Sequence, residues 1–459
     1  MSGTRVPQRG AILLGTAGGL LAVSGLLAAS YYVVASRAEA HGAVHATASA
    51  GEPARAATGT TALQALLAKP VTLAASGNTA QLTWSELGVE IDPDELGRAG
   101  AVDSDADVAK LAAKGSLPVR VDRDKAVAAL RNLKGHYDKA PTDAYLDLEE
   151  RAIHDDVVGE GIDVWASLPR IEAAAHQAAP KLDLAMVAVP ANVTKAGLGI
   201  DDISQVLGHY KTTFPVAEHD RGFNLKLAAS KINGTVLAPH QEWSFNAQVG
   251  ERSEKEGYKI AHVITAGEMV DGLAGGTCQI STTLFGAAFF AGLDIPKTTN
   301  HSRPSVYTPL GFDATVVWPD TDLVLKNPYD FPIAIHYRVS NGEAVVEVLG
   351  KKRPFDKITF AREILEETPF PSEERLKDDM PQGQTMVAQP GFDGYKMTRF
   401  RRFFVGKKMV REQKWTVNYK PVTEYTDRGT STDPSVKPAP EKEVHGPKPP
   451  TNDKFEMSQ

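Results

Sequence analysis

An uncharged apolar run near the N-terminus limits what this chain can fold into more than any other feature does. No residue from Ala11 to Ser36 is charged, and Leu, Ala, Gly and Val dominate the run. It exceeds the ~20 residues with which a helix crosses a bilayer, and Arg5 and Arg9 before it favour an N-terminus on the cytoplasmic side. We therefore expect residues 1–36 to be a cytoplasmic stub and a single transmembrane helix, with the bulk of the chain extracytoplasmic, in the periplasm or the cell wall.

A cleaved signal peptide is the alternative interpretation of the same run. Small residues such as Ala35 and Ala38 lie at its end and just after it, as at a cleavage site. Against this, the run is longer than the ~7–15-residue apolar core of a cleaved signal. Both interpretations export the bulk of the chain.

The composition argues against several classes of protein. A net charge of -7 and the lack of any Lys/Arg block argue against nucleic-acid binding. The single cysteine, Cys278, excludes an intramolecular disulfide and a multi-cysteine metal site. It also disfavours a redox sensor, because the chain has no second cysteine to resolve an oxidised thiol.

Composition and periodicity divide the exported part into an ordered centre with flexible ends. Mixed helix and strand patterns predict an α+β fold, and the Ala/Gly/Thr-rich and Pro/Lys/Glu-rich stretches predict flexible segments. The expected boundaries are a stalk at 37–61, an α+β domain at 62–195, a second α+β domain at 196–350, a small β-rich module at 351–425 and a disordered tail at 426–459.

Individual helices follow from the period of the apolar residues. We expect helices at Arg123–Leu133 and Ala166–Ala178 in the first domain. At the start of the second domain, Ile203, Val206 and Leu207 lie at helical spacing and predict a further helix.

The densest set of chemically informative residues is the string Gly275-Gly-Thr-Cys-Gln-Ile-Ser-Thr-Thr-Leu. The two glycines allow a sharp turn, and the apolar residues from Gln279 to Ala291 recur at helical spacing. Cys278 is therefore expected at the N-terminus of a helix, where amide N–H groups and the helix dipole stabilise a thiolate. Because the same N–H groups could bind a developing oxyanion, the sequence predicts a nucleophilic thiol.

A nucleophilic thiol needs a base and a group that orients the base. His301 follows in Asn300-His-Ser-Arg, and Asp313 in Gly311-Phe-Asp-Ala at the edge of an expected strand. The sequence thus predicts a catalytic set with Cys278 as nucleophile, His301 as base and Asp313 as orienter. Taken singly, His301 also fits a capped loop residue and Asp313 a turn residue.

Five further residues are candidates for binding a substrate or an oxyanion: Gly276, Gln279, Arg252, Arg303 and Asn246. Gly276 admits close approach of another chain, and the two amides could donate hydrogen bonds. The two arginines could each bind a carboxylate through two parallel hydrogen bonds. The structural alternatives are local hydrogen bonds for the amides and a solvated surface for the arginines.

No cofactor and no metal ion are expected, because amide chemistry at a thiol needs neither. A metal site formed by His262, Cys278 and His301 is the alternative use of these side chains.

Several strings together carry a resemblance to a known family. They are Phe223-Asn-Leu-Lys-Leu-Ala-Ala-Ser-Lys-Ile-Asn-Gly, Trp243-Ser-Phe-Asn, Gly275-Gly-Thr-Cys-Gln-Ile-Ser-Thr-Thr-Leu, Asn300-His-Ser, Gly311-Phe-Asp-Ala-Thr-Val and Lys326-Asn-Pro. On these strings, the segment from about Phe223 to Tyr337 resembles the VanW domain of bacterial cell-envelope proteins. The resemblance implies that 196–350 is a VanW domain in an envelope protein; it does not imply a reaction.

The flanking regions carry looser resemblances. Pro141-Thr-Asp-Ala-Tyr-Leu is similar to a peptidoglycan-binding module often found upstream of VanW domains, with an unspecialised spacer as the alternative. The segment from Gln384 to Tyr425 resembles the small G5-type modules of wall-associated proteins.

The resulting functional prediction is an envelope protein that binds peptidoglycan or its precursors and the membrane. Its Cys278, His301 and Asp313 would act in amide hydrolysis or acyl transfer on stem peptides. The alternative is a non-catalytic wall-binding or scaffolding protein, in which Cys278 is a small buried residue at a helix start.

Overall fold

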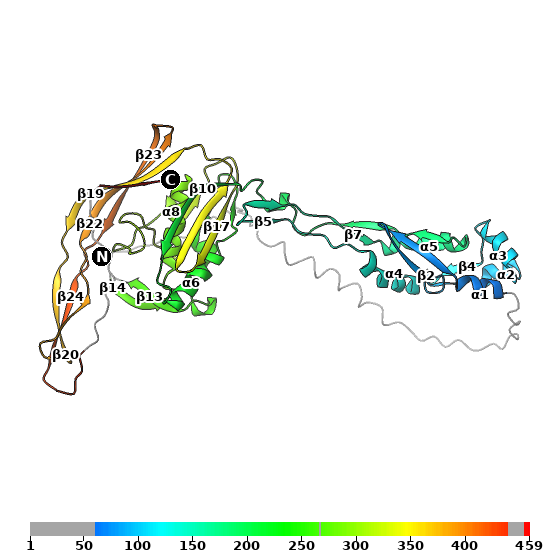
Figure 1. The fold of residues 1–459 in the computed structure, drawn as a ribbon, viewed down its shortest axis with the longest axis horizontal. Helices are drawn as coiled ribbons and strands as arrows, with labels where there is room; N and C mark the ends of the chain where they lie inside the picture. Colours follow the sequence, from blue (N-terminus) through cyan, green and yellow to red (C-terminus); the bar gives the residue numbers. More distant parts are fainter. Residues whose placement is uncertain (1–59, 266–267, 439–453) are drawn as a thin grey trace, which may run out of the picture. The chain divides into compact units, whose positions relative to one another are not determined.

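The computed structural model describes residues 60–265, 268–438 and 454–459, and its fold is shown in Figure 1. It is a mixed α+β structure with more strands than helices, which confirms the predicted class. The expected stub, anchor and nearly all of the stalk (1–59) lie outside the described residues. Within the described part, none of the helices is long and apolar enough to cross a membrane.

Residues 60–195 fold around a hydrophobic core of their own. The elements are α1 (Thr61–Leu67), β1 (Pro70–Ala75), β2 (Asn78–Thr83), β3 (Val89–Ile91), α2 (Pro93–Ala99), α3 (Asp105–Ala112), β4 (Val119–Val121), α4 (Arg123–Tyr137), β5 (Tyr145–Asp147), β6 (Ala152–His154), β7 (Gly159–Ile162), α5 (Val164–His176), β8 (Lys181–Asp183) and β9 (Met186–Val189). A three-stranded sheet has the order β2-β1-β8, with β1 and β8 parallel. Helices α4 and α5 lie within about four residues of the ranges expected from the sequence.

Residues 196–350 form the second domain, which holds Cys278. The elements are η1 (Ala196–Leu198), β10 (Gln205–Thr213), α6 (His219–Ser230), β11 (Val236–Leu237), β12 (Glu242–Ser244), α7 (Phe245–Val249), η2 (Glu254–Glu256), β13 (Ile260–Thr265), β14 (Glu268–Leu273), α8 (Thr277–Ala291), β15 (Asp294–Lys297), β16 (Val324–Lys326), β17 (Ile333–Ser340) and β18 (Glu343–Gly350). An antiparallel sheet has the order β10-β18-β17-β11. Helices α6 and α8 pack against this sheet (Figure 1).

The helix expected around Ile203, Val206 and Leu207 is wrong, because the chain enters strand β10 there. Leu207 is buried against the core of the second domain, whereas Ile203 belongs to a small separate cluster. A bulge between Val206 and Gly208 shifts the register of β10, which obscures the alternation that would have indicated a strand.

Helix α8 is buried along nearly its whole length, with every residue from Gln279 to Ala291 inside. Two glycines allow this close packing. A Cβ atom at Gly208 of β10 would lie 2.2 Å from the backbone nitrogen of Ala291. A Cβ at Gly286 would lie 2.4 Å from the ring of Tyr210. The helix that carries the thiol is therefore held against the sheet by backbone contact.

The C-terminal end of α8 is capped by side chains from the following module. Arg401 donates to the backbone oxygens of Ala288 at 3.1 Å, Leu293 at 2.7 Å and also Phe289. A cation there complements the negative end of the helix dipole. Its buried position lowers the pKa of Arg401 to about 9, so the guanidinium stays largely charged near neutral pH.

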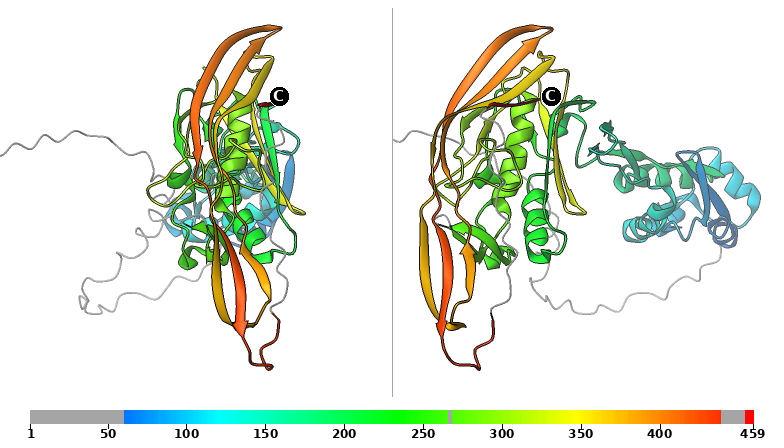
Figure 2. Two further views of the ribbon diagram at one scale, coloured as in Figure 1. Left: turned by 90° about the vertical axis from the view of Figure 1, so that its left-hand side faces the viewer. Right: turned by 60° about the vertical axis from the view of Figure 1, so that its left-hand side comes forward.

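Residues 351–431 and 454–458 form a β-rich module, which confirms the expected strand content. The elements are β19 (Lys357–Thr368), β20 (Ser372–Pro381), β21 (Thr385–Gln389), β22 (Gly394–Val405), β23 (Lys408–Tyr419), β24 (Glu424–Ser431) and β25 (Lys454–Ser458). Two sheets have the orders β23-β22-β19-β25 and β20-β24-β21. Strands β22 and β23 are long and curved (orange in Figure 2).

The prediction of disorder from Thr426 onward is wrong for the described part of the tail. Strand β24 is the central strand of its sheet, and β25 pairs with β19. The sequence signal was weak because β24 is held by backbone pairing on both sides rather than by apolar side chains. In β25, Phe455 and Met457 pack against a core that the second domain and the β-rich module share. Residues 439–453 lie outside the described part.

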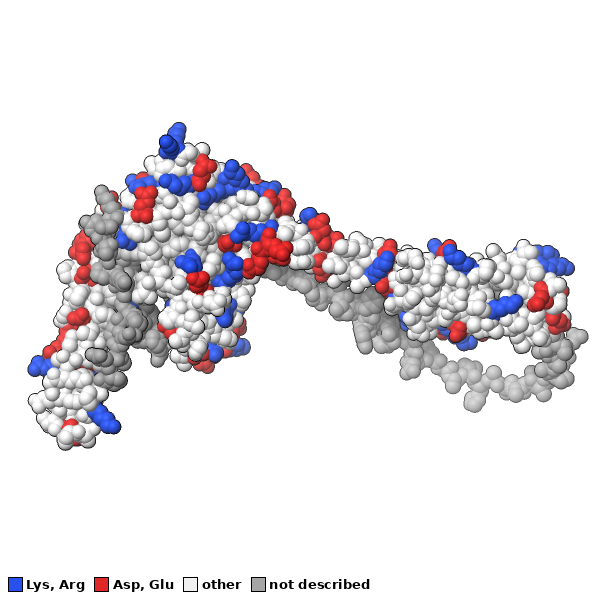
Figure 3. Space-filling view, viewed as in Figure 1, with Lys and Arg blue, Asp and Glu red and all other residues white. Residues whose placement is uncertain are grey.

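Charged side chains of both signs are interspersed on the face shown in Figure 3. Ion pairs on the described surface include Lys211 with Glu343 at 2.7 Å and Arg120 with Glu90 at 2.7 Å. Exposed pairs of this kind contribute little to stability. The charges on this face therefore balance one another locally.

Candidate active site

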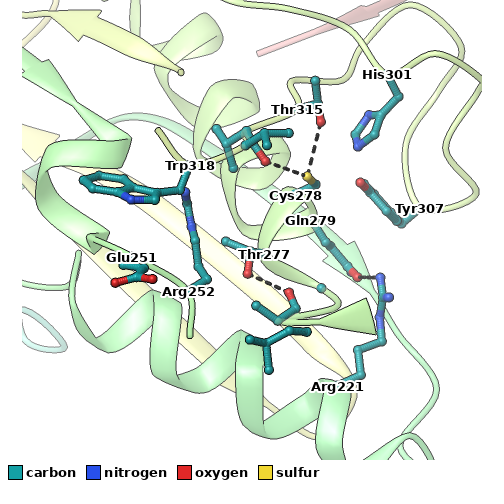
Figure 4. A pocket seen from close by; sticks show the side chains of 15 residues that line it. Arg221, Glu251, Arg252, Thr277, Cys278, Gln279, His301, Tyr307, Thr315 and Trp318 are labelled. Atoms are coloured by element: carbon teal, nitrogen blue, oxygen red, sulfur yellow. Dashed lines mark hydrogen bonds between the residues drawn. The ribbon is translucent and has the colours of Figure 1, made fainter. Parts of the chain in front are cut away.

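A cavity of about 470 Å³ opens at the N-terminal end of α8 (Figure 4). Its lining includes the thiol of Cys278, the ring of His301 and the ring of Tyr307. The other lining residues are Arg221, Glu251, Arg252, Leu273, Ala274, Gly276, Thr277, Gln279, Thr315, Val316, Val317 and Trp318. The cavity thus brings the predicted nucleophile and base to one surface.

Cys278 is the second residue of α8, as the sequence predicted for a thiol at a helix start. Gly276 precedes the helix with φ 108°, a left-handed conformation that favours glycine. The sulfur is half-buried and lies 3.2 Å from the hydroxyl of Thr315 and 3.4 Å from the backbone oxygen of Val316. The turn thus delivers the thiol to the cavity.

His301 and Asp313 form a buried hydrogen-bonded pair. One carboxylate oxygen of Asp313, Oδ2, lies 2.6 Å from Nδ1 of His301 and accepts its backbone N–H at 2.7 Å. These two contacts fix both the loop and the ring of His301. Its imidazole faces the sulfur of Cys278 in Figure 4. Asp313 therefore holds the position of an orienting carboxylate.

The three groups shift one another's pKa values. Burial raises the pKa of the Cys278 thiol, but the hydrogen bond and positive charge of His301 outweigh burial and bring it to about 7. Burial lowers the pKa of His301, but Tyr307, Asp313 and Cys278 together raise it well above its ordinary value. Burial raises the pKa of Asp313, yet its hydrogen bonds with His301 give a net decrease. Near neutral pH, a thiolate–imidazolium pair is therefore well populated.

Two side chains of the C-terminal module support this pair from behind. The phenol of Tyr419 donates to Oδ1 of Asp313 and accepts the backbone N–H of Gly311 at 3.0 Å. Arg399 donates to the backbone oxygen of Gly311 at 3.4 Å. Burial and the charge of Asp313 raise the pKa of Tyr419 well above its ordinary value, so the phenol remains a donor. Sequence reasoning placed Tyr419 in the G5-like segment and gave it no role in the site, because it lies 106 positions from Asp313.

The hydroxyl residues of the cysteine string join α8 to the segment that follows Asp313. Ser281 donates to the backbone oxygen of Ala314 at 2.6 Å, and Thr282 exchanges hydrogen bonds with both backbone groups of Ala314 at 3.1 Å. Thr283 bonds to Thr212 of β10 at 2.8 Å. These hydroxyls set the distance between the helix and the carboxylate.

The side-chain amide of Gln279 is engaged in the fold. Its Nε2 donates to the hydroxyl of Thr212 and the backbone oxygen of Thr213, both at 3.0 Å, and its Oε1 accepts from Arg221 at 2.9 Å. The predicted role as a side-chain oxyanion donor would require breaking these bonds. Figure 4 shows the pairing of Gln279 with Arg221.

A backbone N–H in the first turn of α8 fits an oxyanion better than the side-chain amide of Gln279 does. The N–H of Thr277 donates to Ala274 and that of Gln279 to Gly276. Among the described residues, the hydrogen bonds include no acceptor for the N–H of Cys278. Such a donor, next to the sulfur, is the usual complement to a tetrahedral oxyanion.

The other predicted binding residues separate into two groups. Asn246 is buried and holds a loop through the backbone oxygens of Val317 at 3.3 Å and Thr321 at 3.0 Å. Arg303 is buried over the ring of Phe392 and is not among the residues that line the cavity. Arg252 does line the cavity. Only Arg252 of these three is brought to the nucleophile.

Two groups of side chains are possible metal ligands. The side chain of His262, the alternative ligand beside Cys278, lies outside the described part. Asp147, Glu150 and His154 of the first domain have ligand atoms within 4.8 Å of one another and could hold a metal ion. They line no part of the cavity.

Comparison with known proteins identifies the segment that builds this site. The family described as "VanW like protein" matches residues 220–349. This segment is a VanW domain. It contains Cys278, His301 and Asp313 but not Tyr419 or Arg399, so the VanW domain and the following module share the site.

Two curated relatives are each similar to about a third of the chain. The uncharacterized protein YoaR of Bacillus subtilis is 40% identical over 143 residues, which cover 31% of this chain and 47% of YoaR. The vancomycin B-type resistance protein VanW of Enterococcus faecalis is 27% identical over 144 residues, covering 30% of this chain and 52% of that protein. The chain thus spans about half the length of the curated relatives it matches.

Two solved structures are similar to a small part of the chain. The G5 domain of IgA1 protease is 23% identical, with a TM-score of 0.12, and covers 18% of this chain. The G5 domain of HP0197 is 19% identical, with a TM-score of 0.10, and covers 16%.

Replacing His301 with glutamine is expected to raise the pKa of the Cys278 thiol above the ~8.5 of a free cysteine, because burial then acts without the imidazolium. The rate of alkylation by iodoacetamide, measured from about pH 5 to pH 10, reports this pKa. In the wild type the rate should rise through about pH 7. In the variant that rise should move to higher pH, and an unshifted profile would contradict the assigned pair.

Proposed function

We propose that this chain is a membrane-anchored, extracytoplasmic protein that binds peptidoglycan or its precursors. We further propose that Cys278, His301 and Asp313 catalyse amide hydrolysis or acyl transfer on stem peptides. The observation that carries the proposal is the meeting of a thiol with a pKa of about 7, an imidazole and a buried carboxylate at one cavity. The similarity to a protein named for vancomycin resistance supports a role in the cell envelope.

In the proposed reaction, the Cys278 thiolate attacks the carbonyl carbon of the amide and forms a carbon–sulfur bond. The N–H of Cys278 binds the oxyanion that develops. His301 gives its proton to the leaving nitrogen as the carbon–nitrogen bond breaks, which leaves a thioester and a free amine. His301 acts first as an acid, because its imidazole is already protonated in the thiolate–imidazolium pair before the substrate reacts.

The second half of the reaction restores the protein. His301 removes a proton from water, or from an acceptor amine, as that group attacks the thioester carbonyl. The carbon–sulfur bond breaks, and the thiolate–imidazolium pair returns. Asp313 keeps Nδ1 of His301 oriented throughout. The sequence of steps uses no metal ion and no organic cofactor.

The test uses the full chain in detergent with purified sacculi and soluble peptidoglycan fragments. We expect the protein to sediment with sacculi at low ionic strength, and mass spectrometry to show fragments cleaved or exchanged at an amide. Sedimentation without any change in the fragments would support the non-catalytic wall-binding alternative. If the protein neither sediments with sacculi nor changes the fragments, both the binding part and the catalytic part of the proposal are contradicted.

A further inference from the structure

We infer that the cavity takes a substrate with a free carboxylate in its acyl half, and that Arg252 binds this carboxylate beside Cys278. The inference rests on the proposed acyl transfer at Cys278 and adds the chemical class of the acyl donor. It selects one of the candidate arginines and assigns its ligand.

Arg252 carries a charge that forms no ion pair with a carboxylate of the described part, although Asp322 and Cys278 act on it at longer range. Its Nη2 donates to the neutral amide oxygen of Asn246 at 2.7 Å, and its guanidinium lies 5.4 Å from the ring centre of Phe245. Its Nε and Nη1 are buried and have no hydrogen-bond partner in the described part. A half-buried cation without a counter-ion is costly, so an anionic ligand in the cavity would be stabilised.

The other two arginines near the site differ from Arg252 in their ion pairing or in their position relative to the cavity. Arg221 also lines the cavity, but it pairs with Glu218 at 3.5 Å and donates to Gln279. Arg303 is not among the residues that line the cavity. Of the two arginines that line the cavity, Arg252 is therefore the one that forms no ion pair within the described part.

The position of Arg252 relative to His301 decides which half of the substrate carries the carboxylate. In Figure 4, Arg252 and Trp318 lie on one side of Cys278, and His301 and Tyr307 lie on the other. His301 must reach the leaving nitrogen, so the amine half of the substrate lies on its side of the sulfur. The acyl half then extends toward Arg252.

One acidic group also lines the cavity on that side. Glu251 precedes Arg252 in the chain, but its side chain is exposed and its charge is screened by water. A charge in the less hydrated interior acts more strongly on a bound group than an exposed one does. We therefore expect the buried charge of Arg252 to favour a carboxylate over a neutral group of the same size on this side of the cavity.

The experiment compares two reagents that alkylate Cys278 in the full chain. Iodoacetate brings a carboxylate to the sulfur, whereas iodoacetamide brings a neutral amide of similar size. The rate of iodoacetate divided by the rate of iodoacetamide removes differences in thiol ionisation. We expect Arg252→Met to lower this ratio about 10-fold, because one nearby charge is lost, and Arg221→Met to change it less than about 2-fold, because Glu218 balances Arg221.

Each outcome is informative. An unchanged ratio in Arg252→Met, with both reagents reacting rapidly, would overturn the carboxylate site and leave the nucleophilic thiol intact. An equal decrease of the rate ratio in Arg252→Met and Arg221→Met would also overturn the carboxylate site. The preference for iodoacetate would then come from the overall positive charge near the cavity and not from Arg252 in particular. If neither reagent labels the native wild type, the proposed function itself fails. Arg252→Lys keeps the charge and should retain most of the ratio, which covers the case in which Arg252→Met does not fold.

Discussion

Replacing Cys278 with serine is expected to slow the processing of peptidoglycan amides by at least about 10³-fold. Serine keeps the shape of the side chain, but its hydroxyl does not ionise near neutral pH. The imidazole of His301, held by Asp313, would then face a neutral hydroxyl rather than a thiolate. The measurement is the rate at which fragments of altered mass appear from a defined peptidoglycan fraction.

The comparison needs evidence that the variant protein is intact. Cys278→Ser should sediment with sacculi as the wild type does, because the proposed wall binding does not depend on sulfur chemistry. Its midpoint of chemical unfolding should also stay close to that of the wild type. Wild-type rates in a variant that has no thiol would rule out covalent catalysis by Cys278.

Replacing Gly208 with alanine is expected to destabilise the domain that contains α8 by on the order of 3 kcal/mol. The new Cβ would lie 2.2 Å from the backbone nitrogen and 2.6 Å from the Cα of Ala291, so neither neighbour can rotate away. Strand β10 and helix α8 would have to separate. Chemical unfolding measures the loss, and alkylation should show a less acidic thiol because α8 carries Cys278.

A second glycine in the same domain provides the control. A Cβ at Gly222, within α6, would approach only the ring of Phe214, at 3.3 Å, and that side chain can move. Alanine also favours the helix over glycine by about 1 kcal/mol. We expect Gly222→Ala to change stability by no more than about 1 kcal/mol in either direction. A similar loss in both variants would show that the β10–α8 contact is not special.

The sequence predicted elements with a clear period and missed those without one. Helix α8 was predicted because its apolar residues recur at helical spacing and glycines flank it. Strand β10 was mistaken for a helix because the bulge at Gly208 breaks its alternation. Strand β24 was missed because backbone pairing, which leaves little trace in composition, holds it between two neighbours.

The candidate site also contains residues that the sequence predicted and residues that it did not. Cys278, His301 and Asp313 could be proposed from the sequence because they belong to short strings with chemically informative neighbours, and the structure brings all three together. The phenol behind Asp313 could not be proposed, because nothing in one sequence connects a strand of the C-terminal module to that carboxylate. Arg252 and Arg303 looked equivalent in sequence, and only packing separates them.

The phenol of Tyr419, which donates to Asp313, lies beyond residues 220–349, the segment that matches the VanW family. A chimaera that transplants only residues 220–349 into another host would inherit a thiol, an imidazole and a carboxylate, but would lose the donor that solvates one oxygen of that carboxylate. A fragment that keeps all the side chains of the candidate site must therefore extend through β22 and β23. A host that receives the shorter graft must supply a substitute hydroxyl or accept an aspartate with an unsatisfied oxygen.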